Sequence, residues 1–180
     1  MIYFIEGARN TGKTFLINQL NDINVYKYPF KDIYSVYEEI NDNKQDLNNQ
    51  KDLFYITIGN ASTIIDLINK KLLNDLLFDR SIFSDLVFAI QANRITENEV
   101  INWYNKYFKQ YEHLFKTIFI YSDNINDNRN KDNWDIYNIQ QTNNIYKNLF
   151  DKINYKPILF KNNFDNDSIN KFKKLFKNNT

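Results

Sequence analysis

Eight residues near the start of the chain constrain its fold more than any other feature. They run from Gly7 to Thr14 and match the pattern G-x-x-x-x-G-K-[ST] in full. A short apolar run, Ile2 to Ile5, precedes them, and residues 13–20 carry apolar side chains at helical spacing. Two of the chain's three glycines stand where such a loop must turn and approach a ligand closely. The sequence therefore predicts a strand, a phosphate-binding loop and a helix, in that order.

This loop predicts a binding site for ATP. Its backbone N–H groups and the helix N-terminus are suited to hold phosphate oxygens. Lys13 is expected to reach the β- and γ-phosphates, and Thr14 is expected to ligate Mg²⁺. The predicted nucleotide-binding residues are Gly7, Asn10, Thr11, Gly12, Lys13 and Thr14.

Strand-like and helix-like segments alternate along the whole chain. Strands are predicted at residues 2–5, 24–28, 76–79, 117–121 and 157–160, and helices at 13–20, 32–40, 62–73, 96–111, 134–150 and 168–176. A capping-box pattern formed by Thr96 and Glu99 opens the fourth helix. This alternation predicts one α/β domain spanning residues 1–180, with a parallel five-stranded sheet and helices on both faces, as in P-loop NTPases. Ligands of such folds bind beyond the carboxyl ends of the strands.

A second candidate site lies at the end of the third predicted strand. The apolar run from Leu76 ends abruptly in Asp79, and Arg80 follows at once. An acid in this position of a P-loop enzyme orders the Mg²⁺ shell. A guanidinium can bind phosphate oxygens bidentately. Asp79 and Arg80 are therefore predicted to act with Lys13 in phosphoryl transfer.

Composition narrows the environment and the partners. The chain has no cysteine, so disulfides and thiolate metal sites are excluded. Its net charge of +1 gives no reason to expect a nucleic-acid or membrane partner. The N-terminus does not have the pattern of a signal peptide, so a cytoplasmic protein is expected. The phosphate-binding motif leads us to expect a small-molecule nucleotide substrate. Heavy use of Asn, Ile and Lys favours an AT-rich genome, such as that of a phage acting in its host's cytoplasm or of a low-GC bacterium.

Three short segments together resemble thymidylate kinase and the wider nucleoside monophosphate kinase family. They are Phe4-Ile5-Glu6-Gly7, Tyr28-Pro29-Phe30-Lys31 and Asp79-Arg80-Ser81. The resemblance implies ATP-dependent phosphorylation of a nucleoside or deoxynucleoside monophosphate, with dTMP a candidate. It also implies a homodimer. It places Phe30, Lys31, Arg80, Ser84 and Phe88 around the acceptor, with Lys31 and Arg80 on the acceptor phosphate.

The polar segment at about residues 122–134 is similar to the lid of that family. It is expected to close over the substrates and exclude water, with Arg129 and Lys131 as mobile cations. The chain departs from the family pattern at Arg9, where an acid is common, at Ala61, where an arginine contacts the base, and at Asn133, where the lid carries an arginine. Arg9 or Arg129 is the candidate replacement for the missing cation.

Two alternatives stay open. Deoxynucleoside kinases also resemble this chain, because they carry an acid-Arg-Ser triplet after the same strand, which Asp79-Arg80-Ser81 matches. They transfer phosphate to a hydroxyl and place a carboxylate base after the second strand, where Asp32 or Glu38 would serve. The second alternative is a nucleotide-binding regulatory module that has lost turnover.

Overall fold

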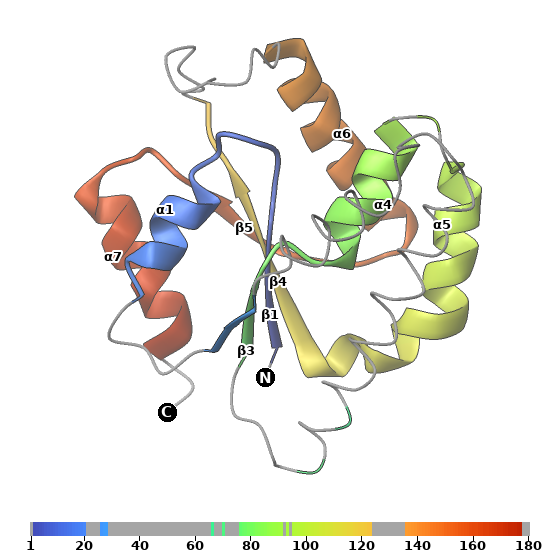
Figure 1. Ribbon diagram of the computed structural model, residues 1–180, viewed down its shortest axis with the longest axis horizontal. Coiled ribbons are helices and arrows are strands. Elements are labelled where there is room, and N and C mark those ends of the chain that lie inside the picture. Colours follow the sequence, from blue (N-terminus) through green and yellow to red (C-terminus); the bar gives the residue numbers. More distant parts are fainter. Residues whose placement is uncertain are drawn as a thin grey trace, which may run out of the picture.

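The protein is described here by a computed structural model that covers residues 2–20, 26–28, 66, 70, 76–91, 93, 95–123 and 136–177. Its strands all run parallel in one five-stranded sheet of order β2-β3-β1-β4-β5 (Figure 1). The bounds are Ile2–Glu6 for β1, Tyr26–Tyr28 for β2, Leu76–Asp79 for β3, Phe115–Tyr121 for β4 and Ile158–Lys161 for β5. The predicted parallel sheet is confirmed.

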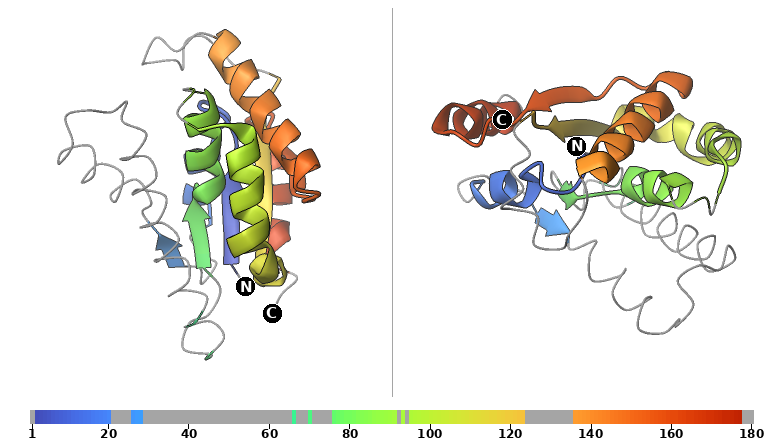
Figure 2. Two further views of the ribbon diagram at one scale, coloured as in Figure 1. Left: turned by 90° about the vertical axis from the view of Figure 1, so that its right-hand side faces the viewer. Right: turned by 90° about the horizontal axis from the view of Figure 1, so that it is seen from above.

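Helices cover both faces of this sheet. Helices α1 (Lys13–Asn18) and α7 (Asn166–Lys177) lie on one face. Helices α4 (Ile82–Gln91), α5 (Glu97–Trp103) and α6 (Ile136–Lys152) lie on the other, as Figures 1 and 2 show from three directions. The helices predicted at 32–40 and 62–73 fall outside the described residues, apart from Asp66 and Lys70.

Strand β1 supplies both halves of the core. It is buried along its whole length, as expected for a central strand of a parallel sheet. Phe4 packs with the aromatic rings of Phe83 and Phe115 on the side of α4 and α5. Tyr3 packs with Phe176 on the side of α1 and α7. This double burial fixes the loop after β1 at the middle of the sheet edge.

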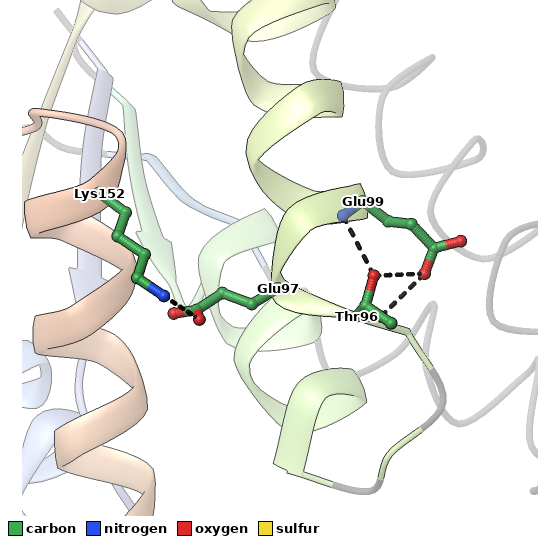
Figure 3. A network of polar contacts seen from close by, with 4 residues as sticks. All are labelled: Thr96, Glu97, Glu99 and Lys152. Atoms are coloured by element: carbon green, nitrogen blue, oxygen red, sulfur yellow. Dashed lines mark hydrogen bonds and ion pairs between the residues drawn. The ribbon is translucent and has the colours of Figure 1, made fainter.

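The segment after α4 differs from the prediction at its end but not at its start. Thr96 and Glu99 form the predicted capping box, and Lys152 of α6 pairs with Glu97 in the first turn of α5 (Figure 3). The single helix expected at 96–111 was wrong. Helix α5 ends at Trp103. A π-helical turn, Tyr104–Phe108, and a 3₁₀ helix, Lys109–Leu114, follow it directly.

The change of helix type has a packing reason. The wider π-turn buries the rings of both Tyr104 and Phe108 against Phe83. The Tyr104 hydroxyl then donates a hydrogen bond to Glu112 Oε1 at 2.7 Å, which anchors the 3₁₀ helix. Within the described part of the chain, no helix has the length and apolar character needed to cross a membrane.

Candidate active site

The loop from Gly7 to Thr14 joins the carboxyl end of β1 to α1, as the sequence predicts. Gly7, Asn10 and Gly12 have φ angles of 134°, 61° and 83°, so the loop depends on left-handed backbone. A Cβ atom on Gly7 would lie 2.1 Å from the carbonyl oxygen of Ile120 in β4. Only glycine therefore lets this loop pass so close to the neighbouring strand.

Lys13 is folded into the loop that precedes it. Its side chain is buried, and its Nζ donates to the carbonyl oxygens of Gly7 at 2.8 Å and Ala8 at 2.5 Å. Burial lowers the pKa of the Lys13 ammonium well below its usual value, and the positive charge of Arg80 adds to this effect. An anion bound in the loop would stabilise the charged form of Lys13 and recover part of that cost.

Thr14, in the first turn of α1, contacts Asp79, the last residue of β3. Asp79 ends β3 and pairs in register with Ile5 of β1, so it lies at the same edge of the sheet as the loop after β1. The Thr14 hydroxyl donates to Asp79 Oδ2 at 3.0 Å. A hydroxyl and a carboxylate converging beside a phosphate loop are the hard oxygen ligands that Mg²⁺ prefers, with water and phosphate completing its shell. These residues fit a magnesium ion.

Arg80 lies directly beyond this pair and is held at several points. Its φ angle is 77°, and its N–H donates to the carbonyl oxygen of Ile5 at 3.0 Å. Its Nη1 donates to Ser84 Oγ at 3.5 Å, and its guanidinium lies over the Phe88 ring at 5.2 Å. The structure thus brings three predicted residues together. Ser84 is buried and its hydroxyl accepts the hydrogen bond from Arg80, and its place near the acceptor stays a prediction.

Glu6 is a site residue whose role the sequence did not reveal. It ends β1 immediately before the loop and is fully buried. Its carboxylate accepts hydrogen bonds from the hydroxyls of Ser81, Ser84 and Tyr146. Burial raises the pKa of the Glu6 carboxyl above its usual value, although these three hydroxyls oppose that rise. The one available signal was an acid at the end of a wholly apolar strand.

Asn162 is a second residue that sequence reasoning missed. It follows β5, is fully buried, and its Nδ2 donates to the carbonyl oxygen of Thr11 at 2.9 Å. Its Oδ1 accepts a hydrogen bond from the backbone N–H of Phe164 at 2.9 Å. One amide therefore connects the phosphate loop to the turn that leads into α7. In a chain so rich in asparagine, no local pattern distinguishes this one.

Of the remaining predicted site residues, Arg9 lies in the described part of the chain and the others do not. Arg9 is exposed on the loop. Phe30, Lys31, Asp32, Glu38, Ala61, Arg129, Lys131 and Asn133 lie outside the described residues, as does most of the predicted lid. Their roles remain predictions.

The strand order, the helices on both faces and the loop after β1 define a P-loop NTPase fold, as predicted. Among solved structures, the chain is similar to deoxyadenosine kinase from M. mycoides in three forms. The form with the products dCMP and a flexible dCDP gives a TM-score of 0.59 at 17% identity. The dATP-bound form gives 0.55 at 16%, and the dCTP-bound form gives 0.51 at 15%.

Each of these three likenesses covers 99% of this chain and 97% of the other. At such identity the likeness establishes a shared fold over nearly the full length of both chains. No protein-family profile matches this sequence. No curated protein matches it either.

Proposed function

We propose that this protein transfers the γ-phosphate of ATP to the 5′-hydroxyl of a deoxynucleoside. The observation that carries the proposal is the pairing of Thr14 with Asp79 at 3.0 Å, beside a complete phosphate loop. The full-length likeness to a deoxyadenosine kinase and the triplet Asp79-Arg80-Ser81 favour a nucleoside over a nucleotide as acceptor. Both features fit the deoxynucleoside kinase alternative better than the thymidylate kinase interpretation.

Phosphoryl transfer of this kind needs positioning and charge neutralisation more than covalent help. Lys13 and the loop N–H groups hold the donor phosphates, and Arg80 neutralises charge on the transferred group. Thr14 and Asp79 would hold Mg²⁺, which when bound would neutralise charge on the donor phosphates. Glu6 does not serve as the base for the acceptor hydroxyl, because its oxygens are buried and already accept hydrogen bonds.

A nucleoside monophosphate acceptor is the second candidate. The segment Tyr28-Pro29-Phe30-Lys31 supports it, because a cation there would hold an acceptor phosphate together with Arg80. A homodimer is also proposed on the resemblance alone, and a cytoplasmic location on the N-terminal sequence. The deoxynucleoside and nucleoside monophosphate proposals predict different acceptors, so one assay separates these two.

The test incubates the purified protein with ATP, Mg²⁺ and each deoxynucleoside, ribonucleoside and corresponding monophosphate, and identifies products by mass. We expect a deoxynucleoside to gain one phosphate. Lys13→Ala should abolish this product while its circular dichroism spectrum stays that of the wild type, because Lys13 acts on the donor phosphates. Phosphorylation of monophosphates alone would move the assignment to the second candidate. Nucleotide binding without transfer to any acceptor would indicate a regulatory module.

A further inference from the structure

A cluster of hydroxyl groups surrounds the buried carboxylate of Glu6. Ser81 Oγ donates to Oε1, while Ser84 Oγ and the Tyr146 hydroxyl reach Oε2 at 2.5 Å and 2.8 Å. Ser84 Oγ and the Tyr146 hydroxyl are also 2.7 Å apart. A carboxylate held this deep in a protein is costly unless each of its oxygens is hydrogen-bonded, and this arrangement satisfies both. Four segments of the chain, β1, the turn after β3, α4 and α6, converge on this one side chain.

The residues of this cluster also make or adjoin the hydrogen bonds that hold Arg80 in place. The backbone N–H of Arg80 is bonded to Ile5, the residue before Glu6, and the residue after Arg80 is Ser81, which is bonded to Glu6 itself. The guanidinium donates to Ser84 Oγ, whose own proton is directed to Glu6. The positive φ angle of Arg80 is unfavourable for a residue with a Cβ atom, so neighbouring contacts must hold it. Glu6 is where these contacts meet.

We propose that Glu6, Ser84 and Tyr146 are positioning residues that hold the Arg80 guanidinium at the phosphate site, with Tyr146 bringing helix α6 into this support. Tyr146 is distinctive because it contacts both Glu6 and Ser84, yet it follows Glu6 in the chain by 140 residues. Without the Tyr146 hydroxyl, Ser84 keeps its hydrogen bond to Glu6 but loses its second partner, so the acceptor for Arg80 is held less firmly. The inference rests on the proposed function only in assigning Arg80 to a transferred phosphate.

The chain offers a matched control for Tyr146. Tyr155 is a partly buried tyrosine that packs against the same core, and burial raises the pKa of both phenols. Its hydroxyl donates to Thr117 Oγ1 at 2.9 Å and accepts from the Thr117 N–H at 3.1 Å, so its hydrogen bonds go to Thr117 and not to Glu6 or Ser84. Tyr155→Phe therefore removes a bonded hydroxyl of the same kind from the same core. A purely structural role for Tyr146 predicts that the two Tyr→Phe variants behave alike.

The first readout is steady-state kinetics of wild type, Tyr146→Phe, Ser84→Ala and Tyr155→Phe. We expect Tyr146→Phe and Ser84→Ala to lower kcat by about tenfold and to leave the KM for ATP within about twofold, because a displaced Arg80 weakens contacts made in the transition state. Tyr155→Phe should keep kcat within about twofold of wild type, whatever its effect on melting temperature.

The second readout does not need turnover. The chain has only four arginines, so ¹⁵N-arginine labelling gives four Nε–Hε signals, and Arg80→Lys identifies one of them. We expect this signal to shift or broaden in Tyr146→Phe and Ser84→Ala and to stay unchanged in Tyr155→Phe. An unmoved Arg80 signal in Tyr146→Phe overturns the proposal, and so does a kcat no lower than that of the control. A wild-type protein with no turnover would instead refute the proposed function, and the labelled signal would then decide on the support of Arg80 by itself.

Discussion

Asn162 offers the sharpest test of how the phosphate loop is held. The change Asn162→Ala removes the donor to Thr11 O and the acceptor for Phe164 N–H, both at 2.9 Å and both attached to a fully buried side chain. Leaving a buried backbone group without a partner costs about 1–3 kcal/mol. Two such groups, discounted because water can reach a loop at the sheet edge, predict a loss of about 3 kcal/mol in the free energy of unfolding. For a chain of this size that loss corresponds to a melting temperature lower by about 6–12 °C.

The assay is urea and thermal unfolding followed by circular dichroism, with Asn163→Ala as the control. Asn163→Ala is the same substitution one position later, where the side chain is exposed. It should change the free energy of unfolding by no more than about 0.5 kcal/mol. ATP affinity, measured by titration calorimetry, should fall by about tenfold in Asn162→Ala, because the Thr11–Gly12 backbone is no longer held in place. If Asn162→Ala is as stable as Asn163→Ala and binds ATP equally well, the reasoning about this amide is refuted.

Two further predictions concern the end of β1. Gly7→Ala should prevent normal folding, because its Cβ would lie 2.1 Å from the backbone oxygen of Ile120 and no side-chain movement can relieve that contact; a soluble variant with the wild-type melting temperature would contradict this. Glu6→Gln should change how stability depends on pH. The pKa of Glu6 is raised on folding above its usual value of 4.5, so the folded chain holds an extra proton between 4.5 and that raised value. The stability from protonated Glu6 is complete below pH 4.5 and is lost as pH rises through the folded pKa. The melting temperature of Glu6→Gln minus that of wild type should therefore increase from pH 4.5 upward, and a constant or falling difference would exclude a raised pKa.

Local patterns in the sequence were sufficient to predict much of the fold. The phosphate loop, the strand ending in Asp79 and the capping box of Thr96 all depend on residues close together in the chain, and all three are confirmed. The shift from α-helix to π-turn at Tyr104 was not predictable in this way. It depends on how the rings of Tyr104 and Phe108 in the π-turn fit against each other and against Phe83 of α4, and apolar spacing alone does not distinguish the two helix types.

The parts of the site that were missed share a physical cause. Glu6 and Tyr146 are bonded across 140 positions, and Asn162 reaches Thr11 across 151. Neither contact leaves a spacing or a periodicity, because each depends on how strands and helices are placed in the finished sheet. Asp79 could be predicted because a carboxylate directly follows the apolar run of a strand. Asn162 could not, because its surroundings in the sequence resemble those of many other asparagines in this chain.

The groups expected to touch phosphate and two of the residues that hold them come from opposite halves of the chain. Lys13, Thr14, Asp79 and Arg80 all lie in its first half. Tyr146 and Asn162, which brace the arginine and the loop, arrive from α6 and from the turn after β5. The phosphate site therefore cannot reach its final geometry until β5 has joined the edge of the sheet and α6 has packed onto its face. A chain ending before β5 would keep the full motif and still lack the amide that holds Thr11, so the motif alone is not sufficient for a competent site.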